Sequence, residues 1–569
     1  MSVSPNIVIK KCTQAGIDFW LASKVALKIG DNLPASERGV NRLIYQTLKE
    51  LDPEAAEVFN VYHGIRVRTT DNSIEYFDRS RITKSLVKET RLPVSVSEDI
   101  AAKVEAEIRR LHLRDISAPL IREMVNVELL NRRLFNAKSK YARLGLPVYD
   151  VSQVLKKPPK MPAGLTAVFG NGIMEEYALT MLLPKECSEA HLNALIHVHG
   201  LSHFALTPLT FLNDLHPFLA QGIRIPGLIS TGPAKKAEVA VSHAARILSI
   251  SKDYVAFGTG IDSLNVLIAP FLRGIPKKRW PQIAQDFLYE LNEHHLPRKA
   301  FTLTMSKKVP GWLAKRRAVL PGGKRDGAYA DYADEAAGFY EIFLEVFKRG
   351  DYDHNRFRFP FLCLKEDNRG HVRLDSSKSF VYSDIVEKPG TGLMQSVSLN
   401  IPRIIHEAGG SEDKMYNEIK KKTLTAFKVF RVKHELMLEN AYKKNFLPFL
   451  TQSFRGKEYA GLKDFYYLLS PDFLSCGVSK LDEGKGSIEL CERIVRYLER
   501  LVKDERKETG LNIRLGYRET EFLRHRNQAE GIPTGTVDTK TVLSLQKLFP
   551  LGLGAKEHIP GIKLSGDLF

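Results

Sequence analysis

Cysteine is scarce and scattered in this chain of 569 residues. The five cysteines are Cys12, Cys187, Cys363, Cys476 and Cys491, and no two of them stand at C-x-x-C spacing. Neither a disulfide framework nor a structural zinc site is therefore indicated. We expect each thiol to be a small buried side chain in a reducing compartment.

Long apolar runs are missing too. No run approaches the roughly 18–20 residues that cross a bilayer, and residues 1–12 contain no apolar signal-peptide core. The most apolar window, SLNVLIAPFL at 263–272, is interpreted as a buried strand. With 43% hydrophobic and 26% charged residues, the composition is typical of a soluble globular protein. We expect a cytoplasmic location and no membrane partner.

The glycine-rich loops that bind phosphate are also absent. The segment GPAKKAE at 232–238 does not fit G-x-x-x-x-G-K-[ST], and no Rossmann glycine pattern is present. The formal net charge is nonetheless +18, which indicates an anionic partner. Because the basic residues are dispersed among acids and no nucleic-acid-binding signature occurs, we expect nucleotides rather than nucleic acid as that partner.

What the N-terminal region does contain is an internal repeat. Segments 21–29 (LASKVALKI) and 100–108 (IAAKVEAEI) match position by position, and their apolar residues recur at three- and four-residue steps. That period is typical of amphipathic helices, and a second and a third helix are predicted after each copy. A fixed offset of this kind indicates a duplicated helical unit.

Between the copies lies IRVRTTDNSIEYFDRSRITKSLVKE, residues 65–89. It begins with an alternating strand, turns at Asp71-Asn72, pairs back through Ile74–Phe77 and enters a helix that Asp78 caps. The segment resembles the ATP-cone, the nucleotide-sensing module of ribonucleotide reductases and their repressors, whose pattern reads V-x-K-R-D-G-x-x-x-x-F-D-x-x-K-I. Matching positions are Val67, Asp71, Phe77, Asp78, Arg81 and Ile82, whereas the K-R pair falls on Thr69-Thr70 and the glycine on Asn72.

This resemblance implies that the segment binds ATP or dATP as an effector. The residues predicted to bind the nucleotide are Arg66, Val67, Arg68, Thr69, Thr70, Asp71, Phe77, Asp78 and Arg81. Threonine hydroxyls and backbone N–H groups can bind phosphate in place of the missing Lys-Arg pair, and two arginines lie nearby. The alternative is a helical docking domain without a ligand.

Composition and motifs divide the chain into five segments. We expect a helical half-repeat of an ATP-cone at 1–59, a complete cone at 60–146, a proline-rich linker at 147–168, a large domain at 169–535 and a tail at 536–569. In the large domain, strands separated by helical stretches favour the α/β class.

Five segments of the large domain, in order, resemble motifs of the anaerobic (class III) ribonucleoside-triphosphate reductase large subunit. They are 174–204, where His197, His199, Leu201 and Phe204 match I-H-I-H-D-L-x-Y-F; 263–275; 355–366, like F-x-F-P; 396–404 (SVSLNIPRI), like V-T-L-N-L-P-R-I; and 508–526. This resemblance covers most of the chain. It implies a ten-stranded α/β barrel with a finger loop through its centre, and 263–275 as a barrel strand and turn.

The family reduces ribonucleotides by radical chemistry. A glycyl radical near the C-terminus generates a thiyl radical on a finger-loop cysteine, a second cysteine follows the I-H-I-H-D strand, and further cysteines bind zinc near the C-terminus. In this chain residues 209–213 contain no sulfur, and the finger-loop interval offers only Cys363, beside the strand and out of register. Residues 536–569 show neither a glycyl radical motif nor a cysteine. We therefore expect no glycyl radical and no zinc site.

Three residues are candidates for a catalytic centre. Cys363 is either a displaced thiyl site or a buried thiol. Asn400 in SVSLNIPRI, and Glu521 at the acidic position of the family's P-A-E-S segment, either contact a nucleotide or are structural, in which case Asn400 caps the strand turn. His197 and His199 stand two apart on a predicted strand and share a face, where we expect a core role rather than a metal site.

These observations favour a catalytically degenerate relative of the anaerobic reductase that retains nucleotide binding. One alternative is an active reductase component whose glycyl radical domain is supplied by another polypeptide. Another is a regulatory protein that senses ATP or dATP through residues 60–146. The resemblance also implies a homodimer, or association with an intact reductase or its activase.

Overall fold

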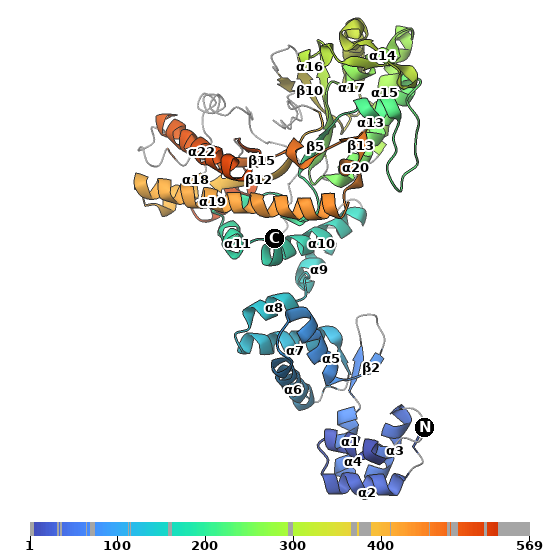
Figure 1. Ribbon diagram of the computed structural model, residues 1–569, viewed down its shortest axis with the longest axis vertical. Coiled ribbons are helices and arrows are strands. Elements are labelled where there is room, and N and C mark those ends of the chain that lie inside the picture. The colour runs from blue at the N-terminus through green and yellow to red at the C-terminus, as the bar shows by residue number, and fades with distance from the viewer. Residues whose placement is uncertain are drawn as a thin grey trace. The chain divides into compact units, whose positions relative to one another are not determined.

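The computed structural model describes the chain except for residues 1–4, 31–32, 35–36, 64, 69–73, 112, 114, 157–161, 294–299, 366–371, 375–388, 410, 455, 475–477, 479–487, 517–519 and 533–569. The predicted tail, 536–569, lies outside the described residues. The chain divides into two compact units, residues 1–144 and 145–569 (Figure 1). Among the helices of the described part, none has the length and apolar character needed to span a membrane.

The first unit contains two small hydrophobic cores in succession. The first core is enclosed by four helices, α1 (Pro5–Gln14), α2 (Phe19–Ile29), α3 (Glu37–Leu51) and α4 (Pro53–His63). The second core is enclosed by β1 (Arg66–Arg68), β2 (Ile74–Tyr76), α5 (Arg79–Thr90), α6 (Val94–Arg110), β3 (Asp115–Ser117), α7 (Ala118–Asn131) and α8 (Phe135–Tyr141). Strand β1 lies between antiparallel β2 and parallel β3.

The internal repeat corresponds to helices α2 and α6. The matched pairs Ala22/Ala101 and Val25/Val104 are all buried, so the repeated apolar positions face the two cores in the same way. Between the repeats, Asp78 begins α5 as predicted, because its side chain accepts a hydrogen bond from the backbone N–H of Ser80.

The second unit alternates strands and helices. Its N-terminal part contains α9 (Val148–Lys156), α10 (Pro162–Tyr177), α11 (Lys185–Leu192), β4 (Ile196–Val198), β5 (Thr210–Asn213), α12 (His216–Gln221), α13 (Ala237–Ser251), β6 (Gly258–Ile261), α14 (Leu264–Leu272), α15 (Trp280–Glu293) and β7 (Ala300–Ser306). It continues with α16 (Gly311–Ala314), β8 (Arg317–Val319), β9 (Arg325–Ala328), α17 (Ala333–Arg349), β10 (Phe361–Lys365), β11 (Val372–Leu374) and β12 (Gly392–Asn400). It ends with α18 (Ile401–Glu407), α19 (Glu412–Met437), α20 (Pro448–Thr451), β13 (Ser453–Phe454), β14 (Lys457–Glu458), β15 (Phe465–Asp472), α22 (Ile488–Thr509), β16 (Ile513–Leu515) and α23 (Glu521–Ala529).

Two sheets organise this unit. The first has the strand order β11-β10-β7-β6-β5, with β5, β6, β7 and β10 parallel and β11 antiparallel. The second has the order β16-β15-β12-β4, with β4 antiparallel to three parallel strands. An antiparallel bridge between Leu212 and Thr391 connects β5 of the first sheet to the start of β12 in the second.

Each sheet packs one face on the large core, and its opposite face, called the polar face here, carries several polar side chains, because side chains alternate along a strand. In the second sheet, Leu399 and Tyr467 face the large core, where α19 and α22 pack (Figure 1). The polar face of the second sheet carries Ser398, Asn400, Ser470, Asp472 and His197, which are neighbours in the strand register. In the first sheet, Thr304 and Ser306 pair with Cys363 and Lys365 and form an equivalent polar face.

Two predictions about local structure are wrong. Residues 263–275, predicted to be a barrel strand and turn, form helix α14, whose residues Leu264–Leu272 are all buried. A segment buried on every side shows neither the strand nor the helix period, so its pattern cannot separate the two. Cys363 does not lie beside a strand but within β10, paired with β7 and β11.

The predicted linker, 147–168, contains α9 and the start of α10.

A buried lysine holds the connection between the two sheets. The Lys433 side chain on α19 is fully buried and donates hydrogen bonds to the carbonyl oxygens of His203 at 3.3 Å, Phe204 at 2.7 Å and Thr207 at 2.7 Å. These carbonyls belong to the segment that links β4 to β5. Burial lowers the pKa of Lys433 to about 7.

We predict that Lys433→Met destabilises the second unit by about 2 kcal/mol or more, because each buried carbonyl left without a donor costs about 1–3 kcal/mol. Urea unfolding measures the effect. Lys428→Met on the same helix is the control, since Lys428 forms only a half-exposed ion pair with Glu186 and such pairs contribute roughly 0–1 kcal/mol. Equal losses in the two variants would contradict the anchoring role.

Candidate functional site

The first unit contains a cavity of about 460 Å³, a size in the usual range for small-molecule sites. It lies among β1, β2, α5, α7 and the end of α8. The residues that line it are Val67, Glu75, Phe77, Asp78, Arg81, Ile82, Ser85, Ala118, Pro119, Ile121, Arg122, Tyr141 and Arg143. The lining is therefore mainly apolar, with a small set of charged side chains.

Local folding brings this lining together. The backbone N–H of Phe77 donates to the carbonyl oxygen of Ile65 at 3.0 Å, which closes the β1–β2 pair just before α5 begins. Val67 is half-buried in β1, and Ile82 is buried on the first turn of α5. Together with Ile121 of α7 they give the cavity an apolar wall.

The charged side chains of the lining are held by ion pairs. Arg81 pairs with Glu75. Arg122 donates two hydrogen bonds to Glu89, at 2.7 and 2.9 Å, and stacks on the ring of Tyr141 at 4.1 Å. The hydrogen bonds to Glu89 raise the pKa of Arg122, and burial raises that of the Tyr141 hydroxyl. This arrangement ties α5, α7 and α8 into one rigid wall.

The residues predicted to bind nucleotide divide into three groups. Val67, Phe77, Asp78 and Arg81 line the cavity. Arg66 and Arg68 flank Val67 on β1 and do not line it, because neighbouring residues of a strand point to opposite faces. The third group, Thr69, Thr70 and Asp71, lies outside the described residues.

Sequence reasoning missed the far wall of the cavity. Ser85, Arg122, Tyr141 and Arg143 line it, yet none belongs to the recognised motif. Ser85 and Tyr141 share a hydrogen bond of 2.7 Å across 56 residues of sequence. Such long-range contacts leave no local pattern that could have revealed them.

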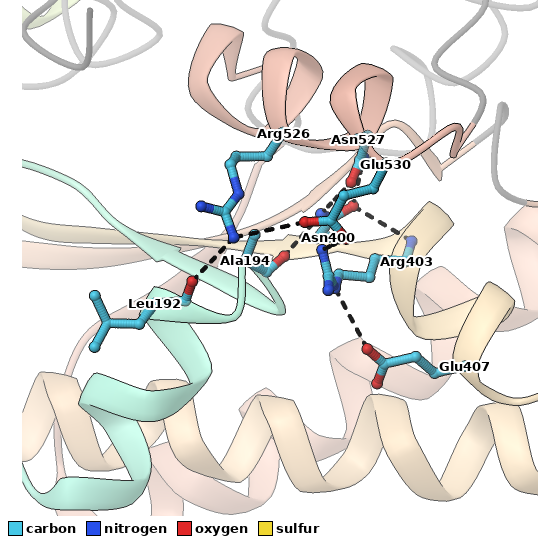
Figure 2. A network of polar contacts seen from close by, with 8 residues as sticks. All are labelled: Leu192, Ala194, Asn400, Arg403, Glu407, Arg526, Asn527 and Glu530. Carbon is cyan, nitrogen blue, oxygen red and sulfur yellow. Dashed lines mark hydrogen bonds and ion pairs between the residues drawn. The ribbon is translucent and has the colours of Figure 1, made fainter. Parts of the chain in front are cut away.

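In the second unit, Asn400 stands at the end of β12 and is fully buried (Figure 2). Its amide nitrogen donates to the carbonyl oxygen of Ala194 at 2.7 Å and to the side-chain oxygen of Asn527 at 2.8 Å. Its amide oxygen accepts from the Asn527 amide at 2.9 Å and from the backbone N–H of Arg403 at 3.4 Å. An asparagine has two N–H donors and two acceptor positions, so its capacity is fully used.

Ion pairs reinforce the connection between α18 and α23. Arg403 contacts Glu407 at 3.3 Å on its own helix and Glu530 at 2.6 Å after α23 (Figure 2). Arg526 contacts Glu530 at 3.5 Å and the carbonyl oxygen of Leu192 at 3.3 Å. Helix α23 is therefore fixed to the end of β12 by a network of hydrogen bonds and ion pairs. Glu521 begins α23, but its side chain lies outside what the structure describes.

A second buried network covers the polar face beside Asn400. Asp472 accepts hydrogen bonds from the Thr520 N–H at 2.9 Å, from the Thr520 hydroxyl and from the Ser470 hydroxyl at 2.7 Å. Ser398 lies 3.2 Å from the Thr520 hydroxyl and 2.8 Å from His199 Nε2. Burial outweighs these hydrogen bonds and raises the pKa of Asp472 to about 7.

His197 on β4 and His199 just after it belong to an aromatic cluster. The His197 ring lies 4.5 Å from that of His199 and 4.8 Å from that of Phe522 on α23, centroid to centroid. Burial lowers the pKa of His197 well below 6.5. The described residues include no group of three or more His, Cys, Asp or Glu side chains that could hold a metal ion. In this environment both rings contribute to packing.

Cys363 is buried on the polar face of the first sheet, on a strand rather than on a loop. Burial raises the pKa of its thiol to about 12. Two residues further along β10, Lys365 pairs with the buried Asp262 at 2.7 Å. Cys363 and Asn400 thus lie in different sheets.

Comparison with known proteins accounts for both units. The family model for anaerobic ribonucleoside-triphosphate reductase matches residues 156–388 and 364–516, and the model for the ATP cone domain matches residues 65–144. The chain therefore belongs to the anaerobic ribonucleoside-triphosphate reductase family and carries an N-terminal ATP-cone.

The similar proteins are distant. Anaerobic ribonucleoside-triphosphate reductases of Escherichia coli and Salmonella typhimurium are 28% identical over 123 residues, which is 21% of this chain and only 16% of either relative. The Thermotoga maritima anaerobic ribonucleotide reductase with dATP in its specificity site has a TM-score of 0.58 at 16% identity, covering 71% of this chain and 82% of that one. Its glycerol-bound structure gives 0.53 at 13% identity, covering 84% and 86%. These structures show a shared α/β fold.

We predict that the stability of the second unit falls as the pH rises, because of Asp472. Its pKa is about 7 when folded, against an ordinary value of 3.8, so between these values the folded chain binds a proton that the unfolded chain has released. The free energy of unfolding should therefore drop by on the order of 3 kcal/mol between pH 5 and pH 8. Asp472→Asn should remove this dependence in urea unfolding. If the free energy of unfolding of Asp472→Asn varied with pH in the same way as that of the wild type, the prediction would be contradicted. Asp253→Asn is the control, because Asp253 is exposed and its substitution should leave the pH dependence unchanged.

Proposed function

We propose that this chain is a catalytically degenerate member of the anaerobic reductase family that binds an adenine nucleotide, ATP or dATP, in the cavity of its ATP-cone. One contrast carries the proposal. The cone retains a cavity of about 460 Å³ lined by residues that match the family pattern. In the reductase-like domain, by contrast, the Asn400 amide of SVSLNIPRI, which matches the Asn of the family motif, makes all its hydrogen bonds within the protein.

The distribution of sulfur supports lost catalysis. Removing a hydrogen atom from a ribose carbon requires a radical, which the family generates on a finger-loop cysteine. No cysteine stands between Cys363 and Cys476 in this sequence, and the β5 segment Leu209–Asn213 contains none. Cys363 itself is enclosed within β10. Cys363, Asn400 and Glu521 therefore have no catalytic role in this proposal.

The proposal extends to the architecture. The two sheets, of five and four described strands, are taken as parts of the family's ten-stranded α/β barrel, and the Leu212–Thr391 bridge between them supports this. The cone occupies 60–146, after a helical half-repeat at 1–59, and the reductase-like domain occupies 169–535. In this arrangement the nucleotide is an effector, and the reductase-like domain associates with a second copy of the chain or with an intact reductase.

The catalytic part of the proposal predicts no turnover. Purified chain is incubated under strict anaerobiosis with an activase, ribonucleoside triphosphates, and formate or a thiol as reductant, and deoxynucleotide is measured by chromatography. We expect none, because no cysteine stands at the positions that the radical requires. An intact family member in the same assay is the positive control. Deoxynucleotide formed in proportion to this chain would overturn the degenerate assignment.

The binding part predicts a single nucleotide site in the cone. Calorimetric titration of the full chain with ATP and with dATP should give a dissociation constant of about 10 μM, or roughly −7 kcal/mol. Phe77→Ala should weaken binding at least tenfold, because stacking a base on an aromatic ring contributes about 1–3 kcal/mol.

Phe135→Ala provides the matched control for this titration. Phe135 is 60% exposed on α8 and does not line the cavity, so its removal should leave affinity unchanged. Circular dichroism establishes that both variants are folded. The absence of heat at millimolar nucleotide with wild-type chain would leave the cone without a ligand and contradict the proposal.

A further inference from the structure

The charges that line the cone cavity nearly cancel. The ionised side chains of the lining are Glu75, Asp78, Arg81, Arg122 and Arg143. Arg122 is in turn paired with Glu89, which does not itself line the cavity. Three guanidinium groups are thus opposed by three carboxylates. A pocket that binds a polyphosphate needs a surplus of cations, because each phosphate brings negative charge out of water.

The guanidinium groups of Arg81 and Arg122 already form ion pairs within the protein. Arg81 on α5 forms an ion pair with Glu75 on β2. Arg122 donates to both oxygens of Glu89 and to the carbonyl oxygen of Tyr141 at 2.8 Å, so most of its donors already have acceptors. A phosphate could recruit either guanidinium only by displacing a carboxylate that is already hydrogen-bonded.

The carboxylate of Asp78 adds a further negative charge to the lining, which disfavours a phosphate there. Its oxygens accept from the N–H and the hydroxyl of Ser80, which keeps the charged group at the N-terminus of α5, on the cavity lining. A helix N-terminus favours an anion, but here the protein supplies that anion itself. Among the lining residues described, Arg143 is the one cation without an ion pair.

The sequence between β1 and β2, which lies outside the described residues, adds no compensating cation. Residues 69–73 read TTDNS, which adds one carboxylate and no cation. The ATP-cone pattern has a lysine and an arginine at the first two of these positions. The Lys-Arg-Asp of that pattern has one more positive than negative charge, whereas Thr69-Thr70-Asp71 of this chain has one negative charge and no positive one.

We infer that this cavity recognises a nucleoside with at most its first phosphate, and that the second and third phosphates of ATP add no affinity. The inference rests on the proposed function of the cone as a nucleotide site and specifies its ligand class. The apolar wall holds the base and sugar, and Arg143 compensates one phosphate. The chain consequently responds to the total adenine nucleotide and not to its state of phosphorylation.

Calorimetric titration of the full chain with adenosine, AMP, ADP and ATP, at constant ionic strength and excess Mg²⁺, tests this ligand class. We expect the dissociation constants of AMP, ADP and ATP to agree within about threefold, since one charge-assisted hydrogen bond to a further phosphate would already give roughly tenfold or more. ATP that binds at least tenfold tighter than AMP would overturn the inference and leave the proposed function intact. No binding of any of the four compounds would overturn the proposed function itself.

Two variants test the electrostatic cause. Glu75→Gln releases Arg81 and should tighten ATP binding by about tenfold while adenosine binding stays unchanged. The double substitution Thr69→Lys with Thr70→Arg restores the cations of the cone pattern and should act in the same direction. Glu98→Gln is the matched control, because Glu98 is exposed on α6 and does not line the cavity. An equal gain in Glu98→Gln, or no gain in Glu75→Gln, would contradict the assignment to Arg81.

Discussion

The four hydrogen bonds of the Asn400 side chain join distant parts of the reductase-like unit (Figure 2). They connect the end of β12 to the loop before β4 and to α23, three parts of the chain that are far apart in sequence. A buried amide with unpaired groups would cost about 1–3 kcal/mol for each of them, so the pairing with Asn527 stabilises the fold. The same pairing leaves the amide no donor or acceptor for a substrate.

Under the proposed loss of catalysis, this constraint explains why the motif SVSLNIPRI is retained. In SVSLNIPRI, Val397 and Leu399 fill the large core, Ser398 joins the Asp472 network, and Asn400 caps α18 and holds α23. Each of these four residues thus has a structural function. In the first unit the ATP-cone keeps a cavity of its own, formed by β1, β2, α5 and α7. The fold of the second unit and the proposed ligand site of the first therefore depend on different residues.

Local sequence patterns predicted the parts of the structure that depend on local interactions. The repeat at 21–29 and 100–108 gives two helices that bury equivalent residues, and Asp78 caps α5. The segment 263–275 was misjudged because every residue of α14 is buried and no periodicity remains. Arg122, Tyr141 and the Asp472–Thr520 network were missed because their partners are distant in sequence. Catalytic candidates taken from motifs alone, Cys363 and Asn400, are buried in different sheets, a placement that only the tertiary fold determines.

The central claim is that nucleotide binds to the cone and not to the reductase-like centre. Hydrogen–deuterium exchange of the full chain, with and without saturating ATP, tests it directly because exchange is read peptide by peptide. The account predicts slower exchange confined to peptides that cover residues 65–89 and 118–143. Slower exchange in peptides that cover 392–407 and 521–530, with the cone unchanged, would contradict it.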